Sequence, residues 1–253
     1  LLSVMAAHFV LGPIGWRIGS VISAVVYAGI SGPYRVIFGA VFGFFYAPLV
    51  ITGLHHMSNA IDLQLISDFG GTMLWPMIAL SNIAQGSAVL GMIVLQRRNA
   101  KAQEINIPSC ISCYLGVTEP AMFGINLKYV FPFFSAMAGS CVAGVLSTAF
   151  SVNASAIGVG GLPGILSIKP ESMGVFALCM LVAVVLPFLL TYGIGRRKGV
   201  DREEERGNGA PEKESPAAEA SGTPLHLKAF LSGKTVPIEE VPDEVFSKKT
   251  LGE

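Results

Sequence analysis

Charged side chains are scarce in the first 195 residues of this chain. The 253 residues include 17 basic and 17 acidic side chains, but only 7 basic and 5 acidic ones precede residue 196. A soluble domain has about 25% charged residues, so this scarcity excludes one ordinary soluble globule. The balanced total charge also argues against nucleic acid as a partner, because nucleic-acid binders have a basic surplus.

Cysteine is also rare, with four in the whole chain, which excludes a disulfide scaffold. Cys110 and Cys113 have the spacing of a redox or zinc motif, but no second pair accompanies them. We therefore expect these two to pack a buried segment, as small side chains do. No Walker motif, Rossmann glycine fingerprint or nucleophile elbow is present, and we expect neither a cofactor nor a metal site.

Long uncharged runs fill most of the first part. Apart from His55 and His56, no charged residue lies in the 26 residues between Arg35 and Asp62, and another uncharged run extends for 40 residues from 129 to 168. A helix needs about 20 apolar residues to cross the hydrocarbon core. Membrane spans are predicted at 36–54, 74–95, 129–150 and 173–195. Segments 1–12 and 18–30 are shorter, and the second is expected to form a tilted or interfacial helix. The alternative is a buried soluble core.

Basic clusters set the expected orientation. Residues 97–101 and 196–198 are rich in Arg and Lys, which is typical of the cytoplasmic side. Two complete spans between them already return the chain to that side, so segment 105–127 is predicted to be re-entrant. The glycine-rich stretch 157–164 cannot hold a regular helix. It is predicted to be an external loop or a second dip into the membrane, of the kind that lines transporter sites; a plain turn is the alternative.

The composition changes after residue 198. Residues 199–224 read as a disordered, charged linker rich in Glu, Gly, Pro, Ala and Ser. Residues 225–253 resemble the first strands of a β-rich soluble domain, which is too short to bury a core alone. Because the chain begins at Leu1 without a Met and ends inside this patterned segment, we expect it to be a fragment of a longer protein.

Ionisable residues inside membrane segments are functional candidates. Glu119 lies in the predicted re-entrant segment, where a carboxylate can accept hydrogen bonds from sugar hydroxyls and act as a base. Its alternative role is a structural partner of Lys128 or of backbone amides. His55 and His56 follow an apolar span, and an imidazole both donates and accepts hydrogen bonds. Only one of these adjacent rings is expected to meet a ligand, and a structural role is the alternative.

Further polar or amphipathic groups are interleaved with the apolar stretches. They suit carbohydrate recognition, but they also bind helices together. These residues are Asn59, Asp62, Gln64, Trp75, Asn82, Gln85 and Asn126. Residue patterns alone thus predict an all-α polytopic membrane protein with re-entrant segments and a transporter site, without naming the solute.

Two short motifs resemble a known family. Gly116-Val-Thr-Glu-Pro120 matches GITEP, and Thr52-Gly-Leu-His-His56 matches the marker ITGLHH. Both are signatures of the membrane (IIC) domain of glucose-superfamily sugar permeases of the bacterial phosphotransferase system. The resemblance spans residues 1–198 and looks most like the trehalose permeases, through segments 59–65, 72–87 and 157–168. Sucrose and β-glucoside permeases share both motifs.

The resemblance implies a homodimeric, multi-pass carrier of the inner membrane that phosphorylates a disaccharide during uptake. The substrate would be held by Glu119, His55 or His56, Thr118 and Asn126, with Glu119 as a base or only a ligand. Phosphate would come from a phosphocysteine of a IIB domain outside this chain, supplied by a IIA domain and the general phosphocarrier protein. Residues 233–247 look like the opening of a glucose-type IIA domain, so residues 225–253 would be its start in the cytoplasm.

Three other functions stay open. A sucrose or β-glucoside permease is the nearest. An ion-coupled sugar transporter would use Asp62 or Asp68 as a proton or cation site, and a sensor would bind sugar without transport. Uptake by a phosphotransferase-system permease depends on phosphoenolpyruvate, whereas uptake by an ion-coupled transporter depends on an ion gradient.

Overall fold

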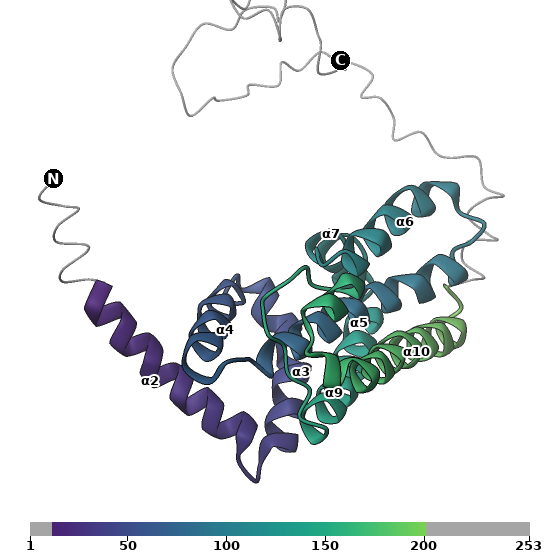
Figure 1. Ribbon diagram of the computed structural model, residues 1–253. Coiled ribbons are helices and arrows are strands. Elements are labelled where there is room, and N and C mark those ends of the chain that lie inside the picture. The colour runs from purple at the N-terminus through teal and green to yellow at the C-terminus, as the bar shows by residue number, and fades with distance from the viewer. Residues whose placement is uncertain (1–11, 201–253) are drawn as a thin grey trace, which may run out of the picture. The chain divides into compact units, whose positions relative to one another are not determined.

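Residues 12–200 are described by a computed structural model, in which they belong to one compact unit. This part of the chain is helical; its two isolated β-bridges join Thr72 to Ala154 and Ala154 to Ile168. The predicted segment 225–253 lies outside the described residues, as do all but the first two residues of the predicted linker 199–224 and all but the last of segment 1–12. Figure 1 shows the elements α2 (Gly12–Ser31), α3 (Arg35–Ile51), α4 (His56–Phe69), α5 (Leu74–Leu95), α6 (Ala100–Tyr114), α7 (Glu119–Ala121), the π-helical turn η2 (Met122–Asn126), α8 (Leu127–Tyr129), α9 (Phe131–Ala149), the 3-10 turns η3 (Leu162–Ser167) and η4 (Pro170–Ser172), and α10 (Met173–Lys198).

Three helical segments in the described range are long and apolar enough to cross a membrane, namely Leu74–Leu95, Phe131–Ala149 and Pro170–Lys198. They confirm three of the four predicted spans. The fourth, 36–54, needs correction. α3 has only 17 residues, and it is long and apolar enough to cross a membrane only together with Ala24–Ser31, from which it is bent by 115°. The apolar run continues beyond α3, but the helix ends at Ile51 and Gly53 adopts a positive φ of 76° in the turn that follows.

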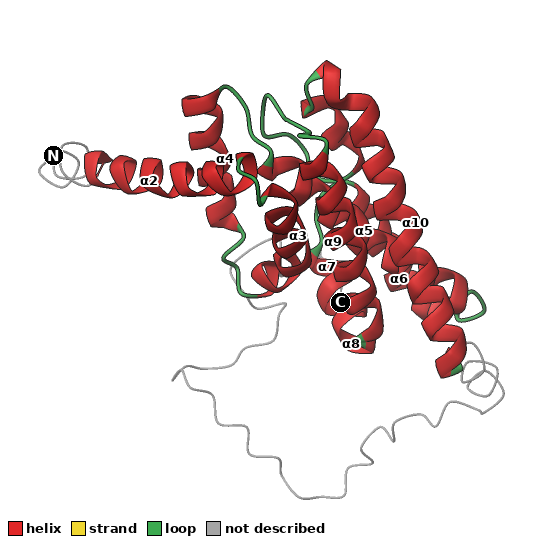
Figure 2. Ribbon diagram, turned by 90° about the horizontal axis from the view of Figure 1, so that it is seen from below, coloured by secondary structure: helices red, strands yellow, loops and turns green. Residues whose placement is uncertain are grey.

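α5 forms the centre of the bundle. In the most apolar 18-residue stretch of α5, 83% of the residues are buried within the protein, whereas the corresponding share is 22% for the segment Pro170–Lys198, which contains α10. α5 packs against α6, α9 and α10, and both views show α5, α9 and α10 running side by side (Figure 1 and Figure 2). Because most of α5 is buried, its polar side chains contact other protein segments, whereas α10 presents leucines outward, as a lipid-facing helix does.

Glycines allow α3 to approach α9 closely. A Cβ at Gly39 would collide with the Thr148 side chain, and one at Gly43 would come within 2.5 Å of the Ser140 carbonyl oxygen. Small residues spaced four apart let two helix backbones meet in a membrane protein. This contact fixes the end of α3, and with it the turn that leads into α4.

Segment 100–129 forms a helical hairpin that returns to the end from which it starts. At its base the Gln96 side chain donates to the Tyr129 hydroxyl over 2.9 Å and accepts from Asn106 over 3.0 Å. The end of α10 lies at the same place, because Lys198 Nζ is 5.2 Å from the centre of the Phe131 ring. Both predicted basic clusters therefore lie at one end of the bundle, and the hairpin follows the path expected of a re-entrant segment.

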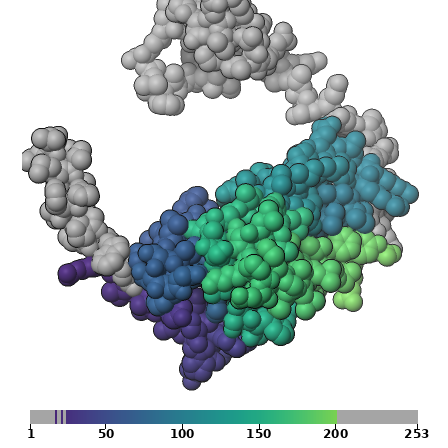
Figure 3. All heavy atoms as spheres, in the orientation of Figure 1, coloured from purple at the N-terminus to yellow at the C-terminus, as the bar shows by residue number. Residues whose placement is uncertain are grey.

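The glycine-rich stretch predicted at 157–164 belongs to an irregular connection between α9 and α10. One end is pinned by the Thr72–Ala154 bridge, whose two N–H···O bonds measure 2.9 and 2.8 Å. In the space-filling view, α4 (blue) lies directly beside the green part of the chain (Figure 3). Further along, Gly160 meets the backbone of Gly116 at the tip of the hairpin. The connection therefore folds back onto the hairpin and is more than a plain turn.

Candidate functional site

A pocket of about 300 Å³ lies where four irregular segments meet. They are the end of α3 with the turn into α4, the first half of α5, the tip of the hairpin, and the glycine-rich connection. Its polar lining includes Tyr46, His55, His56, Asn59, Asn82, Thr118 and Glu119. A small-molecule site of this size, with a few polar groups on apolar walls and broken helices around it, is typical of transporters.

Glu119 stands at the tip of the hairpin, at the start of α7. The preceding turn is held by Val117 N–H, which donates to the Ser112 carbonyl over 2.9 Å, and by Ser112 Oγ, which donates to the Val117 carbonyl over 2.9 Å. Gly116 makes the turn possible with a φ of 100°. Pro120 fits the first turn of a helix, where no N–H partner is needed. The Glu119 side chain is 46% exposed and opens into the pocket.

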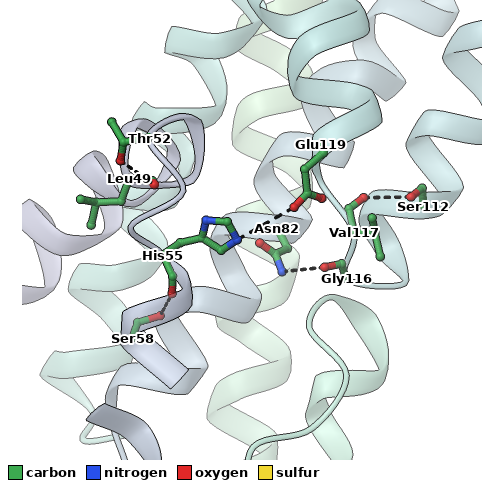
Figure 4. A network of polar contacts seen from close by, with 9 residues as sticks. All are labelled: Leu49, Thr52, His55, Ser58, Asn82, Ser112, Gly116, Val117 and Glu119. Carbon is green, nitrogen blue, oxygen red and sulfur yellow. Dashed lines mark hydrogen bonds and ion pairs between the residues drawn. The ribbon is translucent and has the colours of Figure 1, made fainter. Parts of the chain in front are cut away.

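His55 faces Glu119 from the turn between α3 and α4. Its Nε2 lies 3.9 Å from Glu119 Oε1, and its side chain is only 15% exposed (Figure 4). This distance is too long for a hydrogen bond, but a ligand hydroxyl beside the pair can contact both groups. Burial lowers the pKa of His55; the neighbouring His56 lowers it further and Glu119 opposes both effects. A neutral imidazole is thus favoured near pH 7.

The two histidines differ in their surroundings. Their rings lie 4.0 Å apart, and both line the pocket. His55 is partly buried and also has the Tyr46 ring at 6.5 Å, whereas His56 begins α4 and is exposed. It is His55 whose ring lies within ion-pair distance of Glu119, so His55 is the histidine placed to act together with the carboxylate.

The structure separates the two remaining candidates for substrate contact. Thr118 lines the pocket, although it is 4% exposed. Asn126 is fully buried and absent from the lining; its Nδ2 donates to Gln85 Oε1 over 2.6 Å. Asn126 therefore fastens the hairpin to α5. Sequence alone could not distinguish these roles, because both residues are polar groups on the same predicted re-entrant segment.

Other ionisable candidates lie away from the pocket lining. Asp62 is buried in α4 and accepts from Thr72 Oγ1 over 2.6 Å, whereas Asp68 is exposed and accepts from Gln64 over 2.9 Å. Lys128 lies 5.6 Å from the Tyr129 ring centre at the base of the hairpin. Cys110 and Cys113 are buried, free thiols. Within residues 12–200, no group of three His, Cys, Asp or Glu side chains could hold a metal ion.

Sequence reasoning did not single out Tyr46, and it left three lining residues undecided, namely Asn59, Trp75 and Asn82. Tyr46 had no signal beyond its place in an apolar run, yet it is 4% exposed and borders the pocket. Trp75 and Asn82 appeared only as amphipathic or polar groups within α5, and both line the pocket. A polar side chain in the middle of an otherwise apolar helix, such as Asn82, was the usable signal.

Comparison with known proteins identifies the family. The family described as "Phosphotransferase system, EIIC" matches residues 1–140. The "PTS system trehalose-specific EIIBC component" of Escherichia coli (strain K12) is 54% identical over 198 residues, which cover 78% of this chain and 42% of that protein. The protein of the same description in Bacillus subtilis (strain 168) is 47% identical over 199 residues, with the same coverage.

A relative described for another sugar is also similar. The "PTS system sucrose-specific EIIBC component" of Pasteurella multocida (strain Pm70) is 43% identical over 205 residues, covering 79% of this chain and 42% of that protein. The chain spans about two fifths of the length of these curated relatives. No solved structure matches it. On the strength of the family match and these identities, the chain belongs to the phosphotransferase system EIIC family.

Proposed function

We propose that this chain is the sugar-translocating part of a phosphotransferase-system permease that takes up and phosphorylates trehalose. The observation that supports this most directly is the approach of His55 Nε2 to Glu119 Oε1 at 3.9 Å within one pocket. Both residues come from motifs that mark the family, and they converge from segments more than 60 residues apart. Trehalose is favoured because the relatives of that description are 54% and 47% identical.

The pocket chemistry suits a hydroxyl-rich ligand. Glu119 accepts a hydrogen bond from a sugar hydroxyl, and the neutral His55 imidazole contacts the same or a neighbouring hydroxyl. In the transfer step, the bond between phosphorus and the sulfur of a IIB phosphocysteine breaks and a bond to the sugar oxygen forms. The hydroxyl proton passes to Glu119, and the cysteine leaves as a thiolate. Removing the proton from the attacking hydroxyl is general base catalysis.

The remaining parts of the proposal follow from the family resemblance and from charge. The IIB domain, the IIA domain and the general phosphocarrier protein are the proposed partners, and a homodimer in the bacterial inner membrane is the proposed assembly. The exposed basic residues at the shared end of α5 and α10 favour that end as the cytoplasmic one. The IIB donor would then approach from that end.

Vesicles that contain the full-length protein, phosphoenolpyruvate and the general phosphocarrier proteins provide the test. We expect labelled trehalose to appear inside as trehalose 6-phosphate. Glu119→Gln keeps the size and polarity of the side chain but cannot take up a proton. It should lower the rate of phosphorylation by about 100-fold or more and leave trehalose binding within several-fold of wild type.

Glu104→Gln is the matched control, because Glu104 is an exposed carboxylate on the same hairpin and is absent from the pocket lining. It should behave like wild type. Sucrose run in parallel tests the alternative supported by the sucrose-specific relative. Accumulation of unmodified sugar driven by an ion gradient, without phosphoenolpyruvate, would refute the phosphotransferase proposal.

A further inference from the structure

Asn82 is the amide that α5 presents to the pocket. It lies about a third of the way along that helix and is 7% exposed, on a helix whose other pocket-lining residues are Trp75 and Ile78. A polar side chain this deep in an apolar helix is disfavoured unless it has a defined partner. The partner of Asn82 lies on the hairpin.

The Asn82 side chain joins three segments at one point. Its Nδ2 donates to the Gly116 carbonyl over 3.3 Å. A Cβ at Gly160 would lie 2.5 Å from the same Nδ2, and the backbones of Gly116 and Gly160 are themselves in contact. Asn82 therefore lies where α5, the hairpin tip and the glycine-rich connection meet, and a side chain at Gly160 would displace it.

The hydrogen bond from Asn82 to Gly116 affects the position of Glu119, the proposed base. Gly116 and Glu119 bracket the tip turn, and Gly116 holds a φ of 100° that other residues rarely adopt. Figure 4 shows the Asn82 nitrogen turned toward Gly116 and its oxygen on the side of His55 and Glu119. Fixing the Gly116 carbonyl fixes the start of the turn, so the direction of the Glu119 carboxylate depends on this amide.

We propose that Asn82 is a positioning residue, which holds the hairpin tip so that Glu119 is aligned with the acceptor hydroxyl during phosphoryl transfer. This inference rests on the proposed function. It assigns Asn82 no proton transfer and no bond making. Because positional errors near 1 Å at a reacting group can slow a reaction by about 100-fold, the effect of losing this bond should fall on the transfer step more than on sugar binding.

Asn82→Asp is the informative variant, since aspartate keeps the shape and the oxygen on the pocket side but replaces the donor to Gly116 with an acceptor. We expect the rate of trehalose phosphorylation at saturating sugar to fall about 10- to 100-fold, with trehalose affinity changed less than about 5-fold. Asn106→Asp is the matched control. Asn106 is also a buried amide that joins the hairpin to the end of α5 through Gln96, and it is absent from the pocket lining.

Hydrogen exchange of the purified full-length protein in detergent gives a readout that is independent of transport. Amides 115–121 should exchange faster in Asn82→Asp than in wild type or Asn106→Asp, and faster exchange confined to the base of the hairpin is expected for Asn106→Asp. Equal losses of rate in both variants, or unchanged exchange at the tip, would overturn the assignment. If wild type does not phosphorylate sugar, the proposed function fails, but the exchange experiment still decides whether Asn82 positions the tip.

Discussion

At the scale of single residues, Asp62 is the buried carboxylate that ties α4 to the bundle. It has no exposed surface; its Oδ1 accepts from Thr72 Oγ1 over 2.6 Å, while its Oδ2 has no hydrogen-bond partner within residues 12–200. Burial raises the pKa of Asp62 to about 7, and the hydrogen bonds from Thr72 and from the Trp75 backbone oppose this rise. The folded protein thus holds a proton there more tightly than the unfolded chain does.

This difference predicts a pH dependence of stability. The stabilisation from the bound proton is complete below the unfolded pKa of about 4 and is lost as the pH rises through the folded value near 7. The free energy of unfolding should fall by about 2 to 4 kcal/mol between pH 5 and pH 8. Thermal unfolding of the full-length protein in detergent measures this fall, and Asp62→Asn should flatten it.

Asp68→Asn serves as the control for this measurement, because Asp68 lies on the same helix but is exposed and accepts from Gln64. It should leave the slope of stability against pH as in wild type. An Asp62→Asn protein with the full wild-type slope would show that another group binds the proton.

At the scale of elements, the packing of α3 on α9 depends on its glycines. Gly43→Ala would place a Cβ 2.5 Å from the backbone oxygen of Ser140, which cannot move aside without shifting α9. Overpacking of this kind should destabilise the protein by about 1 to 3 kcal/mol, as measured by unfolding in detergent. The displaced α3 should also weaken sugar binding, because the end of this helix positions His55.

Gly193→Ala is the matched control in α10, where a Cβ would meet no atom within 4 Å. Alanine is the better helix former by about 1 kcal/mol, so this variant should be as stable as wild type or more stable. If Gly43→Ala were equally harmless, the close approach of α3 and α9 would not hold in the membrane.

Sequence patterns predicted the long elements well and the short ones less well. The uncharged runs at 74–95, 129–150 and 173–195 identified three spans, since the length of a membrane helix is set by the bilayer. In the apolar run 36–54 the helix α3 ends at Ile51, before the run does, and Gly53 adopts a left-handed conformation in the turn that follows. Hydropathy measures apolar content and is insensitive to such a turn.

In the candidate site, too, sequence patterns predicted some features and missed others. Glu119 and His55 stand in recognisable motifs, and the structure brings them together. Tyr46 borders the pocket and Asn126 lies outside its lining, because which side chain borders a pocket depends on rotation about a helix axis and on contacts distant in sequence. The π-helical turn η2, which ends at Asn126, alters that rotation within the hairpin.

At the scale of the whole described unit, α5 is the helix on which the hairpin is assembled. Its amides contact the tip through Asn82, the returning arm through Gln85, and the base through the adjoining Gln96. Buried polar groups bind helices together where lipid offers no hydrogen bonds. The hairpin can thus hold broken backbone and Glu119 beside the pocket, because hydrogen bonds to α5 and to the adjoining Gln96 fasten it at the tip, the returning arm and the base.

This arrangement predicts which ends of the protein face the same compartment. The 29-residue span 170–198 separates Glu171 from Lys198, whereas Arg97 lies near Lys198 at the shared end of the bundle because the hairpin returns there. In a variant whose four cysteines are replaced by alanine, we would introduce Glu171→Cys, Arg97→Cys or Lys198→Cys singly. An impermeant maleimide applied to spheroplasts should label the first variant, and the other two only after the membrane is opened. Opposite labelling of the Arg97 and Lys198 variants would mean that the hairpin crosses completely, and external labelling of both would reverse the orientation that the basic residues favour.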